Sequence, residues 1–202
     1  MNSNTQISLE EADQLIGQVQ AAHRLAAGFY SRLLVLLDEM AQQLALQFWY
    51  WSSEEDIKVP KGGTQARYRP VWDFLPLFVS SHCYSRLGEK GTTLNDVGLA
   101  FVVYVDDSYD ADGEARQVKR GVPDPVELPI GRAVLRTYLY RATEASPRSF
   151  YELWDKCPWV ETSEAWVDVT GVGMKGLGRE WKLRDVIVNP QDVVTFLRPL
   201  CE

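Results

Sequence analysis

The sequence is short of the residues on which most catalytic and metal sites depend. Its 202 residues include only two histidines, His23 and His82, and three cysteines, Cys83, Cys157 and Cys201. The cysteines are odd in number and show neither a C-x-x-C motif nor any other metal-ligand spacing, so they indicate neither a disulfide framework nor a zinc site. We therefore expect reduced, buried thiols, with no metal and no cofactor.

Long apolar runs and an excess of basic residues are also absent. No apolar run approaches the ~18 residues of a membrane span, and the polar start lacks the basic and apolar regions of a signal peptide. We therefore expect a cytoplasmic protein without membrane contact. The net charge of -7 argues against nucleic-acid binding, which depends on Lys and Arg contacts to phosphates. The sequence still allows a local basic surface, because segment 116–148 has seven basic residues against three acidic ones.

The clearest pattern in the sequence is a helical one at its start. Ser8-Leu-Glu-Glu11 has the S-x-x-E form of a capping box, and apolar or small residues then recur at spacings of three and four as far as Leu44. We predict one long helix over 8–51. At ~1.5 Å per residue it would be about 60 Å long, against about 40 Å for the whole domain. It must therefore either bend at Gly17 or Gly28 or project from its own domain.

Two more helices and a loop are predicted outside the strands. Segment 52–70 lacks periodicity and is rich in Gly and Pro, which indicates a surface loop. Segment 74–87 has apolar residues in helical register and Gly88 just past its end, which predicts a second helix. Asn189-Pro190 can begin a short final helix over 190–197.

The sheet is predicted within segment 97–188. Residues 97–105 are β-rich and apolar without alternation, as in a strand covered on both faces. Further strands are predicted over 133–142, 165–169 and 180–188, with a short helix after the capping box that begins at Ser149. The sequence thus predicts a single α+β domain over residues 1–202. In it, the long helix and the second helix pack on a mainly antiparallel sheet of about four strands, with short helices between and after the strands.

Two motifs suggest ligand sites but fit loops better. Gly171-Val-Gly173-Met-Lys-Gly176 matches G-x-G-x-x-G, yet a strand-like segment follows where the nucleotide-binding motif needs a helix, so we interpret it as a hairpin loop. Segment 106–114 groups five carboxylates, which could hold a hard cation. Its spacing does not fit an EF-hand, and a solvated acidic turn is the interpretation we favour.

One arrangement resembles a known catalytic core. Asp168 on one predicted strand and Glu180-Trp-Lys182 on the next resemble the D…E-x-K core of the PD-(D/E)xK nuclease family. The resemblance implies two carboxylates that bind Mg²⁺ and a lysine that assists the attacking water. The alternative function is therefore a metal-dependent phosphodiester hydrolase. Cross-strand pairs of surface charges would explain the same residues. The arginines proposed to bind phosphate in this alternative are Arg132, Arg136 and Arg141.

The surplus of large aromatic residues points to another class of function. Residues 48–51 are four adjacent aromatics, which cannot all face inward from one helix, so we expect one or two to be exposed. Trp and Tyr often anchor protein interfaces. An over-long helix would also need a partner surface, and most soluble oligomers are two-fold dimers. The residues that we assign to an interface on these grounds are Trp49, Trp51, Trp72, Ile16, Val19 and His23.

The leading hypothesis from the sequence is a non-enzymatic, cytoplasmic protein-binding module. It would act as an accessory, regulatory or inhibitor protein and would form a homodimer through the long helix. No catalytic residue is assigned outside the hydrolase alternative.

Overall fold

The computed structural model describes residues 7–53, 79–87, 91–94, 96–109 and 129–202. The described elements are α1 (Leu9–Gln43), β1 (Gln47–Ser53), β2 (Val79–Arg86), β3 (Val97–Tyr104), η3 (Asp107–Tyr109), β4 (Val134–Ala142), α2 (Phe150–Trp154), β5 (Val167–Val169), β6 (Met174–Lys182), α3 (Leu183–Val188) and α4 (Gln191–Cys201). The strands form one sheet in the order β1-β2-β3-β4-β6-β5, and every neighbouring pair is antiparallel.

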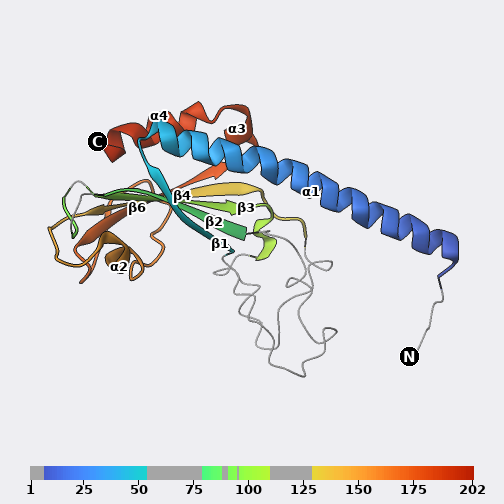
Figure 1. Ribbon diagram of the computed structural model, residues 1–202, viewed down its shortest axis with the longest axis horizontal. Helices are drawn as coiled ribbons and strands as arrows, with labels where there is room; N and C mark the ends of the chain where they lie inside the picture. The colour runs from blue at the N-terminus through green and yellow to red at the C-terminus, as the bar shows by residue number, and fades with distance from the viewer. Residues whose placement is uncertain (1–6, 54–78, 88–90, 95, 110–128) are drawn as a thin grey trace, which may run out of the picture.

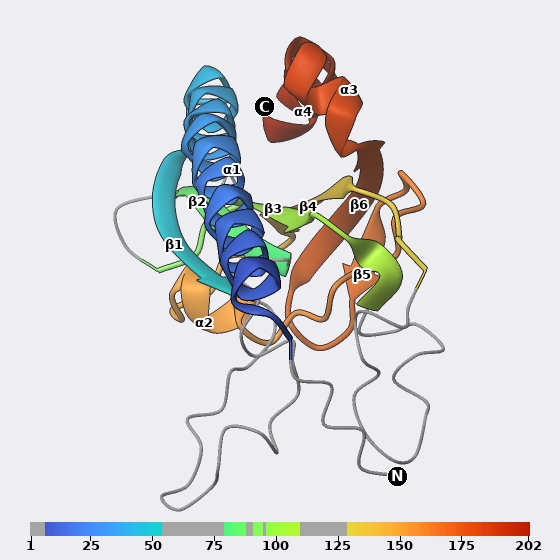
Figure 2. The ribbon, with the colours of Figure 1, turned by 90° about the vertical axis from the view of Figure 1, so that its right-hand side faces the viewer.

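Helices cover both faces of this sheet. Helices α1, α3 and α4 lie over one face, and the short α2 lies against the other (Figures 1 and 2). The predicted α+β class and the antiparallel sheet are therefore confirmed. The sheet has six strands rather than about four.

Helix α1 begins where the capping box predicts and does not bend. The Ser8 hydroxyl accepts a hydrogen bond from the Glu11 backbone N–H at 3.2 Å, and the Glu11 carboxylate accepts one from the Ser8 N–H at 2.7 Å. The helix continues through Gly17 and Gly28 without a break. Figure 1 shows it running straight past the edge of the sheet. Its buried residues begin only at Leu33, so its first half projects from the domain.

The long helix ends earlier than the predicted residue 51. Ala45 has a left-handed φ of 55°, and the Leu46 N–H donates to the Ala41 carbonyl while the Ala45 N–H donates to the Gln42 carbonyl, both at 3.0 Å. These two bonds form a Schellman motif, which normally has glycine at the left-handed position. Because alanine takes that position here, the sequence carries no stop signal. The aromatic residues that follow belong to β1.

The predicted helix over 74–87 is wrong where the structure describes it. Residues 79–86 form β2, which is paired with β1 on one side and β3 on the other. All its residues except the last are buried, including His82 and three serines. Such polar residues do not show a strand pattern, and the pairing with two neighbours outweighs local preference. Residues 54–78, including most of the predicted loop, lie outside the described residues.

Strand β3 is the central strand, as predicted. Its residues Leu99 and Phe101 pack in the core under α1, and Ala100 and Val102 pack in the core on the side of α2. Strand β4 also lies within its predicted range. The sheet is therefore buried on both faces at its centre, which explains the continuous apolar run.

The hairpin loop predicted over 171–176 is confirmed in its first half, because residues 171–173 lie in the turn between the antiparallel strands β5 and β6. Gly171 and Gly173 have left-handed φ of 76° and 69° there, whereas residues 174–176 already belong to β6. A Cβ atom on Gly178 would lie 2.7 Å from the Glu161 carbonyl oxygen, so glycine lets the chain cross closely over β6. The strand predicted over 180–188 is corrected accordingly, because residues 183–188 form α3. The final helix is confirmed and extends to Cys201.

The side chains of α1 are exposed or partly buried in its first half and include fully buried residues only from Leu33 onward. Met40 is fully buried, whereas Leu36 is only partly buried. Substitutions in the two halves should therefore affect stability differently.

We expect Leu37→Ala to lower the free energy of unfolding by about 2–5 kcal/mol, because Leu37 is fully buried. Leu15→Ala, in the exposed half of the same helix, should change it by no more than about 0.5 kcal/mol in the monomer. Urea denaturation of both variants at low protein concentration measures the difference. Equal losses would show that the projecting half is buried by the chain itself.

Candidate functional site

A bulge in β1 divides its four aromatic residues between the two faces of the sheet. Phe48 pairs with Tyr84 and Trp51 with His82, and the register shifts between Phe48 and Tyr50. The extra residue, Trp49, therefore faces the other side, where its ring stacks on Tyr151 with centroids 3.9 Å apart. A bulge of this kind re-aims side chains at the edge of a sheet. Phe48 and Trp51, three positions apart, thus share the face that lies beside α1.

These two rings line a groove between α1 and the edge of the sheet. The groove has a volume of about 250 Å³. Phe48 and Trp51 are each 56% exposed although both are large and apolar. The residues that line the groove are Leu34 and Asp38 from α1, Phe48 and Trp51 from β1, and His82 and Tyr84 from β2.

The polar groups of the groove are held in a defined arrangement. The Tyr84 hydroxyl donates to Oδ1 of Asp38 at 2.6 Å. Burial, together with this hydrogen bond, raises the pKa of Tyr84, so the phenol remains a donor. Among the described residues that line the groove, Asp38 is the one acidic residue, and none is a lysine or an arginine. The groove therefore combines aromatic surface with a single fixed carboxylate.

His82 and Ser80 make a buried contact beneath this groove. Oγ of Ser80 and Nε2 of His82 are 3.0 Å apart. Burial lowers the pKa of His82 below its ordinary value of 6.5, and the charge of Asp38 opposes this shift. A serine next to a neutral histidine suggests a nucleophile and its base. Ser80 is completely buried, however, so a substrate cannot reach its hydroxyl, and we assign the contact a structural role.

The other residues predicted for an interface lie in different parts of the structure. Ile16 and Val19 are 56% and 49% exposed on the projecting half of α1, and His23 is exposed on the same half. Trp51 is exposed in the groove, whereas Trp49 packs within the domain against α2. Trp72 lies outside the described residues.

The structure does not form the D…E-x-K arrangement that resembles the nuclease core. Asp168 of β5 pairs with Lys175 of β6, and five positions along β6 separate Lys175 from Glu180. Five positions correspond to about 17 Å, and an odd number of positions places two side chains on opposite faces of a strand. The two carboxylates therefore cannot share a metal ion, which is a correction to the geometry that the resemblance implies.

The arginines assigned to phosphate binding have other partners. Arg132 contacts Asp107 and Glu180, each at 2.7 Å, and Arg136 contacts Glu180 at 3.1 Å. The third, Arg141, donates to the Leu200 carbonyl at 2.9 Å and so satisfies the C-terminal end of α4. These contacts brace the sheet and its helices. Arg132 and Arg136 share the Glu180 carboxylate, whereas Arg141 lies at the other end of β4, so the three arginines do not meet at one phosphate site.

The described part of the acidic segment 106–114 also has a structural role. Oδ1 of Asp106 accepts hydrogen bonds from the N–H groups of Ser108 and Gly131, both at 2.9 Å. Asp107 binds Arg132. Residues 110–114 lie outside the described residues. In the part of the chain that is described, no three His, Cys, Asp or Glu side chains are grouped so that they could hold a metal ion.

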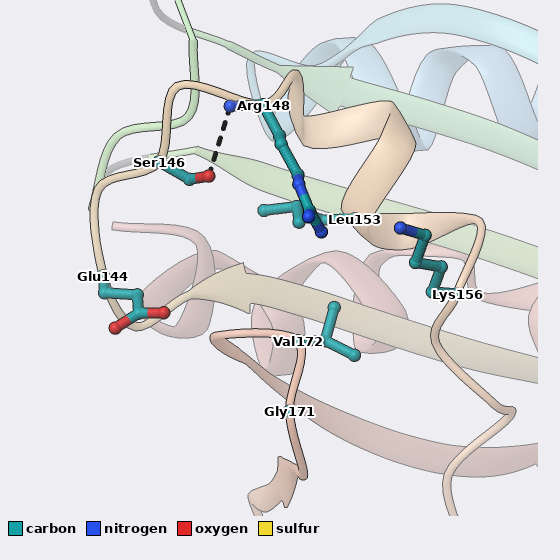
Figure 3. A pocket seen from close by; sticks show the side chains of 7 residues that line it. All are labelled: Glu144, Ser146, Arg148, Leu153, Lys156, Gly171 and Val172. Carbon is teal, nitrogen blue, oxygen red and sulfur yellow. Dashed lines mark hydrogen bonds between the residues drawn. The ribbon is translucent and has the colours of Figure 1, made fainter.

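A second, polar hollow lies at the other end of the sheet, beside the turn before β6. Its volume is about 200 Å³. Figure 3 shows the side chains of Arg148 and Lys156 reaching toward each other over it, with Glu144 at the far side. These three charged residues are exposed, and their charges are mixed. The groove beside β1, with one sign of charge and two exposed rings, is therefore the better defined site.

Comparison with known protein families finds a match over most of the chain. A family model described as PM0109 matches residues 9–189. The chain belongs to the PM0109 family. The matched residues include the projecting half of α1 and all six that line the groove. No curated protein and no solved structure matches this PM0109 chain. Among the described residues, none of the helices is long and apolar enough to cross a membrane.

The burial of His82 makes the stability of the protein depend on pH. The unfolded chain takes up a proton at His82 near pH 6.5, whereas the folded chain resists it. The unfolded state therefore binds more protons below that pH, and we expect the free energy of unfolding to fall as the pH is lowered through 6.5.

Urea denaturation at about pH 7.5 and about pH 5.5 measures this effect. His82→Gln should reduce the loss of stability between the two pH values. A loss of stability that is the same in the unchanged protein and in His82→Gln would contradict the assignment.

Proposed function

We propose that this protein is a non-enzymatic, cytoplasmic protein-binding module, and that the first half of α1 joins two copies into a homodimer. One observation carries the proposal. None of the residues 9–28 is buried in the described structure, although the helix has an apolar seam along this half. The seam contains Ala12, Ile16, Val19 and Ala26, with His23 among them.

A helix of this kind is unstable without a surface to lie on. Residues 9–28 span about 30 Å of helix at ~1.5 Å per residue. Isolated helices of about this length are marginal in water, because nucleation is unfavourable and most helical stability in proteins comes from packing of an apolar face. A second copy of the same seam supplies such a face, with Ile16 and Val19 at its centre.

The charges along α1 favour an antiparallel arrangement of the two copies. The first turns carry Glu10, Glu11 and Asp13, whereas the next charged residue along the helix is Arg24. An antiparallel pair places the acidic end of one helix beside the basic part of the other, and it also opposes the two helix dipoles. A parallel pair would place like charges together.

The non-enzymatic part of the proposal is supported by the roles of the candidate catalytic residues. Glu180 is held by Arg132 and Arg136, and the buried Ser80 is closed to substrates. All three cysteines are free thiols, and two of them are buried. Free thiols fit a reducing compartment such as the cytoplasm.

Sedimentation equilibrium tests the homodimer. We expect the unchanged chain to be a dimer and the Ile16→Glu, Val19→Glu double variant to be a folded monomer, because the two-fold axis would bring four buried carboxylates together. Circular dichroism checks that the sheet and the second half of α1 remain folded.

A matched control carries the same change of charge on another side of the helix. Gln14→Glu with Leu25→Glu places two carboxylates away from the seam, and this variant should remain a dimer. If the unchanged chain is a monomer at all concentrations, or if both double variants behave alike, the seam is not the interface.

A further inference from the structure

Strand β1 is an edge of the sheet in the described structure. It pairs with β2 on one side, and no other described strand pairs with it. The outward N–H and C=O groups of an edge strand can pair with a strand from another chain. Addition of an extended peptide to such an edge is a recurring mode of protein recognition, in which pockets beside the edge select particular side chains.

The groove beside β1 is suited to a cationic side chain. The Asp38 carboxylate uses Oδ1 to accept from Tyr84, and no described residue forms an ion pair with it at Oδ2. The exposed rings of Phe48 and Trp51 form the outer wall. Aromatic faces attract ammonium and guanidinium groups, and a carboxylate adds a charge-assisted hydrogen bond. His82, the remaining polar group, is neutral because burial lowers its pKa.

We propose that β1 binds an extended basic segment of another protein, which adds to the sheet as a further strand and places an Arg or Lys side chain in the groove. That side chain lies against Phe48 and Trp51 and pairs with Asp38. The bulge at Trp49 makes this possible, because it puts both rings on the face of the sheet that also carries Asp38 above it.

The dimensions of a sheet agree with this placement. An added strand would lie about 4.8 Å from β1, and long side chains on one strand reach diagonal neighbours about 7–8 Å away. Residues on the same face of the added strand would therefore reach over β1 into the groove. Alternate residues would face the side of α2, where Tyr50 is partly exposed, so the segment should alternate basic and apolar residues.

This inference rests on the proposed protein-binding function, but it concerns a different surface. The groove is lined by the second half of α1 and by two strands, whereas the dimer seam lies in residues 9–28. A result that rules out peptide binding at the groove therefore does not rule out the dimer seam, and a result that rules out the dimer seam does not rule out peptide binding at the groove.

Selection from a displayed library of random peptides tests the proposal. Peptides of about twelve residues are long enough to cover a strand of ordinary length. Binders to the intact chain should be enriched in sequences that contain Arg or Lys within an alternating apolar pattern. Enrichment of sequences without a basic residue, or no enrichment at all, would overturn the proposal.

Titration of the selected peptide into variants identifies the site. Asp38→Asn should raise Kd about tenfold or more, because a charge-assisted contact is lost, while the amide oxygen can still accept from Tyr84. Trp51→Ala should also weaken binding. Glu39→Gln removes the neighbouring charge of the same helix, which does not line the groove, and should change Kd by no more than about twofold.

Two further measurements separate the possible outcomes. A peptide with methylated backbone amides at alternate positions should bind weakly, because it cannot donate to the edge of β1. Asp38→Asn should sediment like the unchanged chain, whether that is a dimer or a monomer. Equal affinity of the peptide for the unchanged chain and for Asp38→Asn would show that the groove is not where it binds.

Discussion

The structure depends on a mismatch between the length of α1 and the length of the strands that it covers. Helix α1 has 35 residues, or about 52 Å at ~1.5 Å per residue, whereas the longest strands have nine, or about 30 Å. Only the part of α1 from Phe29 onward packs against the core that lies over the sheet, and its fully buried residues begin at Leu33. The same helix is thus a core element at one end and a free surface at the other, and the proposed dimer follows from that difference.

Local signals in the sequence predicted the parts of the fold that local interactions decide. Both capping boxes, at Ser8 and Ser149, begin helices as expected, and the apolar run of β3 marks the buried centre of the sheet. The failures occur where contacts distant in sequence decide. Strand β2 contains polar residues that are buried by its two neighbours, and Gly178 of β6 is a glycine because another segment crosses over it. Neither constraint can be read from neighbouring residues.

The candidate site was only partly accessible to sequence reasoning for the same reason. The sequence predicts that one or two of the four aromatics at 48–51 are exposed, and three of them are: Phe48, Tyr50 and Trp51. The groove itself depends on a bulge at Trp49 and on the position of Asp38 above β1, and neither leaves a pattern in the sequence. The resemblance to the nuclease core is wrong for a related reason. Spacing in the sequence places Asp168 and Glu180 on adjacent strands, but the register of β5 against β6 sets them five positions apart and on opposite faces of the sheet.

Hydrogen–deuterium exchange along α1 tests the central claim, that its first half is stabilised by a partner and its second half by its own domain. Amides of residues 33–43 should be protected at every protein concentration. Those of residues 12–28 should be protected at high concentration and should exchange rapidly on dilution or in the Ile16→Glu, Val19→Glu variant. Equal protection of both halves, independent of concentration and of these substitutions, would contradict the account.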